Sequence, residues 1–300
     1  MNTIRAMITI TAVLIPGFTP YSAELKSDAA IRCSSCDGWN QSQAPFKIHG
    51  NTFYVGTAGL SSVLIATDKG LILLDADLPQ SAALIDEHIR SLGYRTTDIR
   101  FIVNSHVHFD HVGGIAALQR ASGATIAVSS ASAVALTAGE LQPDDPQYGM
   151  GKRATSFPAV TNTKIIKDGE VLRVGDIAIT AHLTPGHTPG GTTWTWKSCE
   201  QSKCIDIVYA DSLNAVSADG FRFSDDPKLV ETFRHSIAIV EKMPCDILIP
   251  VHPEFSDIQG KAARLKAGEK ENPFIDNQAC RNYAVAAAEK LKNRLATEQR

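Results

Sequence analysis

The sequence predicts an α/β fold in which two mixed β-sheets pack face to face with helices outside. Short apolar runs bounded by turn residues recur in both halves of the chain, and such runs are typical of buried strands. Segments with helical periodicity lie between them, so each sheet has helices to cover its outer face. The length of 300 residues, of which 44% are hydrophobic, is sufficient to build one such core.

Strands are expected where apolar runs end at turn residues, and helices where apolar residues recur with a helical period. Gly93 and Gly123 are expected to end the first two helices. Residues 142–161 are rich in proline, glycine and polar residues and are predicted to form a long loop, which is uncommon unless functional. The predicted strands are residues 63–66, 71–74, 100–103, 125–128, 177–183, 192–196, 205–209 and 246–251. The predicted helices are residues 81–92, 115–121, 132–138, 227–242 and 278–296.

Residues 1–23 are predicted to be a signal peptide that directs export to the periplasm. The single charge of Arg5 precedes an apolar run over residues 6–18, which is shorter than the about 20 residues that a membrane-spanning helix needs. We expect cleavage between residues 23 and 30; the alternative is a membrane anchor that stays attached. Residues 24–44 then form an N-terminal arm, and residues 45–300 form one globular domain.

The composition excludes two classes of function. Lys and Arg number 29 against 32 Asp and Glu, a net charge of −3, whereas a general nucleic-acid binder needs a basic surface. No stretch after the signal peptide is long and apolar enough to span a membrane. The expected partner is a small molecule, and the expected state is a monomer.

The six cysteines are expected to form disulfides, because an exported chain folds in an oxidising compartment. Proximity favours a bridge between Cys199 and Cys204, and Cys245 with Cys280 is a candidate long-range pair. The Cys-x-x-Cys motif at residues 33–36 could be redox-active or half of a zinc site, but its polar N-terminal setting favours a structural bridge. The sequence alone does not choose among the pairings.

Four potential metal ligands lie together directly after the predicted strand 100–103. His106 and His108 are two positions apart, so in an extended chain they point to the same side and can bind one metal ion. Asp110 and His111 occupy the following turn and can reach a second ion beside the first. A ligand set of histidine and carboxylate without cysteine is typical of catalytic rather than structural zinc sites. The alternative is a polar loop with incidental histidines, which this spacing disfavours.

Two further histidines follow predicted strands in rigid turns. His187 ends the motif Thr-Pro-Gly-His after strand 177–183, and His252 stands before Pro253 after strand 246–251. Proline and glycine restrict the backbone at both places, as a preorganised ligand requires.

The remaining histidines are interpreted as bystanders. His182 lies within a predicted strand, where a packed or edge position is favoured over a contact with His187. His49, His88 and His235 lie in the arm or on helix faces and are expected to be surface residues.

This arrangement resembles the metallo-β-lactamase superfamily. The motif His-x-His-x-Asp-His after a strand, the Thr-Pro-Gly-His turn and the late histidine carry the resemblance, which covers roughly residues 40–300. The superfamily has an αβ/βα sandwich with a zinc site on one edge of its two sheets. Residues 39–41, 209–213 and 244–246 look like subclass B3 of the metallo-β-lactamases. Cys245 and Cys280 also match a disulfide seen in that subclass.

The resemblance implies two zinc ions that share a water and lower its pKa. It implies hydrolysis of the β-lactam ring amide of penicillins, cephalosporins and carbapenems by a zinc-bound hydroxide, which confers antibiotic resistance. Asp110 is the implied catalytic residue, because its carboxylate can orient the hydroxide. The implied ligands are His106, His108 and His187 for the first ion, and Asp110, His111 and His252 for the second.

Ser212 and Asn214 are implied to hold the carboxylate of the substrate. Ser212 stands where other subclasses have a cysteine ligand, and Asn214 takes the position of a second serine. Asp211 is expected to support a ligand from behind, although an aspartate near this position bridges the two metals in glyoxalase-II-like relatives. Apolar side chains of the loop 142–161 either line the substrate groove or pack within the loop.

Two other functions stay open. Another dinuclear zinc hydrolase of this fold, such as a lactonase or a glyoxalase-II-like thioesterase, would use the same ligands. A non-catalytic zinc-binding or interaction protein would have no need of an open dinuclear site.

Overall fold

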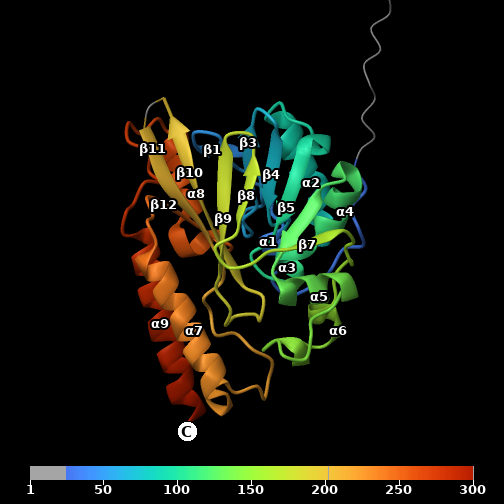
Figure 1. Cartoon of the computed structure of the whole chain (residues 1–300), viewed down its shortest axis with the longest axis vertical. Coiled ribbons are helices and arrows are strands. Elements are labelled where there is room, and N and C mark those ends of the chain that lie inside the picture. Colours follow the sequence, from blue (N-terminus) through green and yellow to red (C-terminus); the bar gives the residue numbers. More distant parts are fainter. Residues whose placement is uncertain (1–24, 202, 300) are drawn as a thin grey trace, which may run out of the picture.

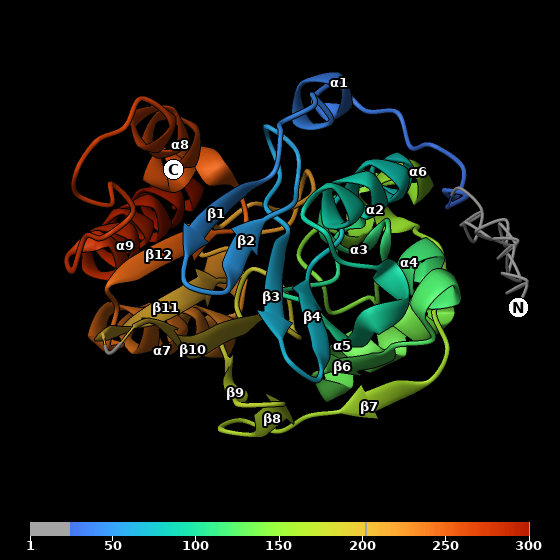
Figure 2. The ribbon, with the colours of Figure 1, turned by 90° about the horizontal axis from the view of Figure 1, so that it is seen from above.

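The structure is a computed structural model that describes residues 25–201 and 203–299. In these residues a seven-stranded and a five-stranded sheet pack face to face, and helices cover the outer face of each sheet (Figures 1 and 2). This arrangement confirms the predicted α/β sandwich. The predicted signal peptide, residues 1–23, lies outside the described part of the chain. Among the helices that are described, none is both long and apolar enough to cross a membrane.

The first sheet has its strands in chain order, β1 to β7, and the second has the order β12-β11-β10-β9-β8. The strands are β1 Phe46–His49, β2 Thr52–Tyr54, β3 Val63–Thr67, β4 Gly70–Leu74, β5 Ile99–Val103, β6 Thr125–Val128, β7 Thr163–Ile165, β8 Val171–Val174, β9 Ile177–Leu183, β10 Thr192–Glu200, β11 Lys203–Ala210 and β12 Ile247–Pro250. The helices are α1 Cys36–Trp39, α2 Ala82–Ser91, α3 Phe109–Val112, α4 Ile115–Ser122, α5 Ser130–Ala138, α6 Lys152–Thr155, α7 Pro227–Lys242, α8 Ile258–Lys266 and α9 Ala279–Glu298.

Every strand and helix expected from the sequence is present, and the elements that the sequence did not predict are mostly short. Strands β1, β2, β7 and β8 have three or four residues each, which is too short for a periodic pattern to stand out. Strands β10 and β11 continue past their expected ends and form a hairpin. The predicted loop 142–161 contains helix α6, and helix α8 was missed because its sequence is largely polar.

Alternating side chains of the central strands build two layers of apolar core. In β3, Val63 and Ile65 point between the two sheets, whereas Leu64 points to the outer helices. Trp194 of β10 fills the layer between the sheets, and its indole Nε1 donates to the carbonyl of Asn104 at 2.9 Å. This hydrogen bond ties the second sheet to the segment that follows β5 in the first sheet.

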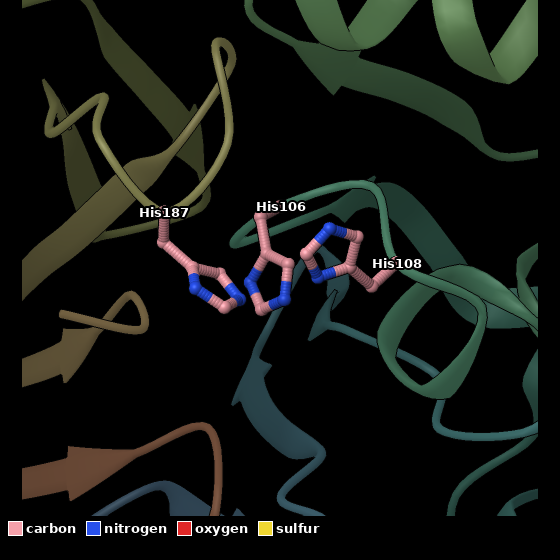
Figure 3. A group of neighbouring side chains, drawn as sticks. All are labelled: His106, His108 and His187. Atoms are coloured by element: carbon pink, nitrogen blue, oxygen red, sulfur yellow. The ribbon is translucent and has the colours of Figure 1, made fainter. Parts of the chain in front are cut away.

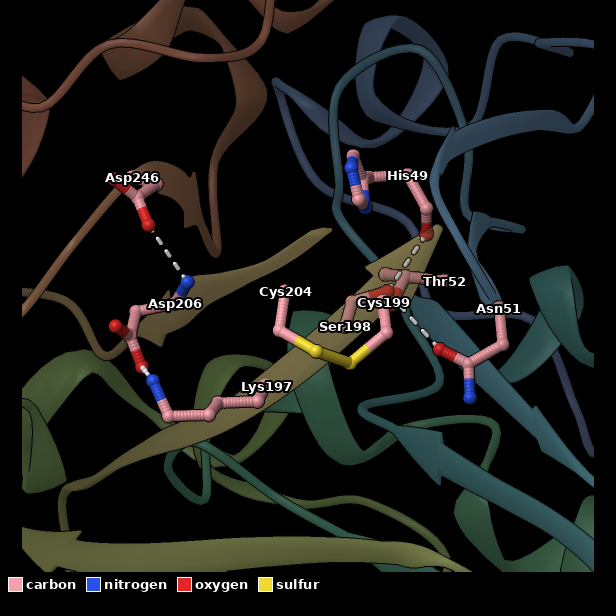
Figure 4. Close-up of a disulfide and its surroundings, with 9 residues drawn as sticks. All are labelled: His49, Asn51, Thr52, Lys197, Ser198, Cys199, Cys204, Asp206 and Asp246. Atoms are coloured by element: carbon pink, nitrogen blue, oxygen red, sulfur yellow. Dashed lines mark hydrogen bonds and ion pairs between the residues drawn. A yellow bond between two sulfur atoms is a disulfide. The ribbon is translucent and has the colours of Figure 1, made fainter. Parts of the chain in front are cut away.

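The three candidate disulfides are all present, and they join Cys33 with Cys36, Cys199 with Cys204, and Cys245 with Cys280. The Cys199–Cys204 bridge joins β10 and β11 near the end of their hairpin, and Figure 4 shows it beside His49, at the end of β1. The Cys245–Cys280 bridge ties the segment before β12 to the first turn of α9.

The structure corrects two expectations about histidines. His49 and His88 are buried, with 5% and 4% of their surface exposed, and are not surface residues. The Nδ1 atom of His88 lies 2.8 Å from the carbonyl of Val55, which offsets the cost of burying the ring. Because Val55 is 33 positions from His88, the sequence around His88 does not indicate that the ring is buried. His235 is exposed, as expected.

The end of helix α9 is fixed by a buried carboxylate. Glu298 accepts hydrogen bonds from the amides of Phe223 and Ser224 at 3.2 and 2.7 Å, and it also pairs with Arg294. Burial alone would raise the pKa of Glu298, but these hydrogen bonds outweigh it and lower the pKa to about 2. The carboxylate therefore contributes stability that is fully present above its unfolded pKa of 4.5 and is lost as the pH falls toward 2.

We expect Glu298→Gln to lower the free energy of unfolding by about 1–3 kcal/mol at pH 7. The deficit should shrink as the pH falls below 4.5, where the wild-type carboxyl becomes protonated in the unfolded state. Urea unfolding of both proteins at several pH values measures this deficit in the free energy of unfolding. Glu289→Gln, on the exposed face of the same helix, is the matched control. A deficit of the same size at every pH would contradict the role given to the charge.

Candidate metal centre

The loop after β5 is held from both sheets before its potential ligands begin. Asp75, directly after β4, accepts hydrogen bonds from the Ser105 amide at 2.7 Å and the Ser105 hydroxyl at 2.6 Å. Trp194, in the second sheet, donates its indole hydrogen bond to the carbonyl of Asn104, the residue before Ser105. The chain then stays extended through His108 and enters the short helix α3. The local structure is thus the extended segment followed by a turn that the spacing predicted.

Three histidine side chains from two distant segments come together at one edge of the sheets (Figure 3). His106 and His108 come from the loop after β5, and His187 comes from the turn after β9. The ring centroids lie 4.7 Å apart for His106 and His108, and 4.8 Å from each of these to His187. All three are buried, and each offers one nitrogen within 4.8 Å of the others.

A second cluster lies beside the first and consists of Asp110, His111 and His252. The Oδ2 atom of Asp110 is 3.4 Å from His111 Nε2 and 3.5 Å from His252 Nε2. The rings of His106 and His111 are 4.2 Å apart, so the two clusters are adjacent. Helix α1 reaches this cluster, because the ring of its last residue, Trp39, lies 5.4 Å from that of His252.

Each histidine of the first cluster has one ring nitrogen held from behind by an oxygen. Such a contact fixes the tautomer and the orientation of the ring and turns the other nitrogen toward a metal. The contacts are His106 Nδ1 to Asp211 Oδ1 at 2.8 Å, His108 Nε2 to Asp145 Oδ1 at 3.3 Å, and His187 Nδ1 to the carbonyl of Asn214 at 2.7 Å. In His108 the other nitrogen, Nδ1, also lies 3.4 Å from the side-chain amide of Gln147.

The charge states suit metal binding. Burial lowers the pKa of His106 and His187, and neighbouring imidazoles lower it further, which favours the neutral ring that a metal ion needs. Burial would raise the pKa of Asp110, but the adjacent His111 and His252 outweigh it and hold the carboxyl ionised. Among the described residues, the buried Nε2 atoms of His106 and His111 have no hydrogen-bond partner. Buried nitrogens without a partner are costly unless something binds them, and the donor set is one that Zn²⁺ prefers.

Three buried carboxylates behind the site were missed by the sequence analysis. Asp75 lies 3.6 Å from His111 Nδ1, and burial raises its pKa to about 6. Burial raises the pKa of its neighbour Asp77 to about 7. Two aspartates directly after a predicted strand were a signal that could have found this pair. Asp145, the partner of His108, lies in the long loop and carried no such signal.

The proposed substrate-binding side chains lie next to the first cluster. Ser212 is 2% exposed, and the Nδ2 atom of Asn214 is 3.4 Å from its hydroxyl. His182 is half-buried and binds the Thr195 hydroxyl at 2.9 Å, so it makes no hydrogen bond to His187 in the described structure.

The long loop 142–161 sends its aromatic and apolar residues to different places. Tyr148 and Met150 are exposed by 48% and 39%, whereas Phe157 is packed in the core under the outer helices. The carbonyl of Pro146 accepts a hydrogen bond from the amide of Ala218 at 2.9 Å, so the loop meets the segment that follows β11. Of the three, only Tyr148 and Met150 are available to a bound molecule.

Two adjacent clusters of imidazole and carboxylate at the edge of a two-sheet sandwich define a dinuclear metal hydrolase. Residues 56–195 match the family model of the metallo-beta-lactamase superfamily. The chain belongs to this superfamily, and its two clusters are those of a dinuclear zinc enzyme.

Comparison with known proteins supports this assignment over most of the chain. MEM-A1, a subclass B3 metallo-beta-lactamase from a soil metagenome library, is 46% identical over 87% of this chain and 98% of its own, with a TM-score of 0.83. SMB-1, solved with mercaptoacetic acid, is 45% identical over 87% of this chain and 99% of its own, also with a TM-score of 0.83. Human acyl-coenzyme A thioesterase MBLAC2 is 30% identical over 201 residues, which cover 63% of this chain and 68% of the relative.

Proposed function

We propose that this protein is a subclass B3 metallo-β-lactamase that hydrolyses the ring amide of penicillins, cephalosporins and carbapenems. The observation that carries the proposal is the pair of adjacent three-residue clusters. They lie in a chain whose sequence is 46% identical to that of a subclass B3 enzyme over 87% of its length. Hydrolysis of this bond would confer resistance to the antibiotics that contain it.

The residues of the two clusters are proposed to act as ligands, with three histidines for one zinc and Asp110, His111 and His252 for the other. When bound, the ions supply Lewis acidity that polarises the lactam carbonyl and lowers the pKa of water. Asp110, held ionised, can accept a hydrogen bond from the attacking water and orient it. Ser212 and Asn214 donate hydrogen bonds to the carboxylate of the substrate. Asp211 fixes the His106 ring and does not itself act as a ligand.

We expect the purified protein to hydrolyse nitrocefin and imipenem, to lose this activity with a chelator and to regain it with zinc. The reason is that buried imidazoles bind Zn²⁺ far better than they bind hard cations, which prefer oxygen. Absorbance assays with metal analysis measure it, and addition of Mg²⁺ is the matched control. A protein that holds two zinc ions and turns over no β-lactam would not be a β-lactamase.

The likeness to a human acyl-coenzyme A thioesterase supports a second candidate, thioester hydrolysis at the same centre. A bridging aspartate would favour that candidate. Asp211 instead contacts His106 Nδ1 at 2.8 Å, whereas the nitrogen available to a metal is Nε2, on the other side of the ring. Asp211 therefore supports the ring and does not bridge the metals, which favours the lactamase. Rates with nitrocefin, S-lactoylglutathione and an acyl-coenzyme A, measured on one preparation, distinguish the two candidates.

We expect Asn214→Ser to raise KM for several β-lactams by roughly two- to tenfold with little change in kcat. A serine hydroxyl reaches less far than the amide and loses one of its donors. Steady-state kinetics with a penicillin, a cephalosporin and a carbapenem measure the effect. Asn293→Ser, at an exposed position of α9, is the control, and an unchanged KM for all three drugs would count against a role for Asn214.

The protein is further proposed to be exported to the periplasm and to act as a monomer, with residues 24–44 as an arm on the domain 45–300. All six cysteines are paired, and disulfides persist in oxidising compartments. Both ligand clusters come from a single chain. N-terminal sequencing of periplasmic protein and size-exclusion chromatography test the two statements.

A further inference from the structure

Helix α9 holds the segment that follows β11 at two points. The Tyr283 hydroxyl donates to the carbonyl of Asp211 at 3.0 Å and accepts from the amide of Leu213 at 3.2 Å. Two turns further along the same face, Lys290 Nζ donates to the side-chain Oδ1 of Asn214 at 3.1 Å. The helix thus contacts both the residue behind His106 and the residue behind His187.

Lys290 is held in place although its side chain is exposed. Its ammonium lies 4.5 Å from the centroid of the Phe255 ring, a cation–π contact. Phe255 is in turn 6.1 Å from the ring of His252. A cavity of about 410 Å³ is lined by Lys290, Phe255 and Asn214. Among the described residues, no carboxylate lies within ion-pair distance of Lys290, although Glu254, Asp257 and Asp276 line the same cavity.

The Lys290 contact decides which way the Asn214 amide faces. An ammonium group only donates hydrogen bonds, so its partner must be the amide oxygen. The Nδ2 end then lies near the Ser212 hydroxyl, at 3.4 Å, and presents donors there. With the amide reversed, an oxygen would lie beside Ser212 and would repel an anion.

We infer that Lys290 is a positioning residue that sets the Asn214 amide as a donor for the carboxylate of a bound ligand. Lys290 thereby favours anionic over neutral ligands at the metal centre. This inference rests on the proposed function, because it names how that site selects a β-lactam carboxylate. It concerns a residue on a helix that contributes no metal ligand in the described structure.

The test compares two thiols that differ in one group: mercaptoacetate carries a carboxylate and 2-mercaptoethanol does not. Their affinities for the zinc-loaded protein are measured by calorimetry for wild type, Lys290→Met, Lys290→Arg, Asn214→Ser and the double variant K290M/N214S. Lys292→Met is the matched control, because Lys292 lies on the same helix, is exposed, and pairs with Glu289 at 3.2 Å. A thermal melt of each variant shows that it is folded.

We expect Lys290→Met to weaken the binding of mercaptoacetate roughly three- to tenfold, the effect of losing one partly exposed charged hydrogen bond. The affinity for 2-mercaptoethanol should be unchanged. Lys290→Arg should restore the preference, and Lys292→Met should not alter it. In the Asn214→Ser background the Lys290→Met change should add no further loss. Equal losses for both thiols, no loss at all, or a full loss that persists without Asn214 would overturn the inference. If the protein hydrolyses no β-lactam but Lys290→Met still weakens mercaptoacetate binding alone, the proposed function is wrong and the positioning role of Lys290 stands.

Discussion

Replacement of His187 or His252 by alanine is expected to lower kcat/KM for nitrocefin by roughly 100- to 10,000-fold. Each change removes one of three proposed ligands from one metal and leaves the other metal complete. We expect the fold to survive, because both side chains lie in turns beyond the ends of β9 and β12. Kinetics at limiting zinc, metal analysis and circular dichroism together measure the effect.

His182→Ala is the matched control for His187→Ala. His182 lies in β9 itself, five positions earlier in the chain, and binds the Thr195 hydroxyl. We expect this variant to keep near-normal activity and zinc content. Near-normal rates for His187→Ala or His252→Ala at limiting zinc would instead show that the ligand assignment is wrong.

Replacement of Asp211 by alanine is expected to cost roughly 10- to 100-fold in zinc affinity or activity, the usual range for a residue that holds a ligand from behind. The change removes the acceptor at 2.8 Å from the buried Nδ1 of His106 and leaves that nitrogen with only the Ser105 hydroxyl at 3.2 Å, so the ring is held less firmly. Burial raises the pKa of Asp211, and a neutral carboxyl or amide can accept the same hydrogen bond. Competition with a zinc-binding dye and nitrocefin kinetics measure the effect.

Two variants calibrate this second prediction. Asp211→Asn keeps an oxygen that can accept from His106 and should retain most of the zinc affinity. Asp206→Ala, in strand β11 just before Asp211 and paired with Lys197 at 2.8 Å, should behave as wild type. If Asp211 bridged the two metals, asparagine would fail as badly as alanine, and that result would favour the thioesterase-like candidate.

Much of the fold was predictable because its signals are local. Strands such as β3, β4 and β9 are continuous or alternating apolar runs that end at turn residues, and these patterns depend only on neighbours in the sequence. The histidine-rich loop was predictable for the same reason, since His106 and His108 stand two positions apart in an extended segment. The burial of His88 was not, because its partner Val55 is 33 positions away.

The sequence by itself determined the two-sheet architecture and the six metal-ligand positions that we propose. Only the tertiary structure decided which ring or side chain each supporting residue contacts, because those contacts join segments that packing alone brings together. Asp211 and His106, for example, are 105 positions apart, and Lys290 lies 76 positions beyond Asn214. Sequence periodicity sets the direction of a side chain within its own segment. Which oxygen meets which imidazole depends on how β5, β11 and α9 pack against one another.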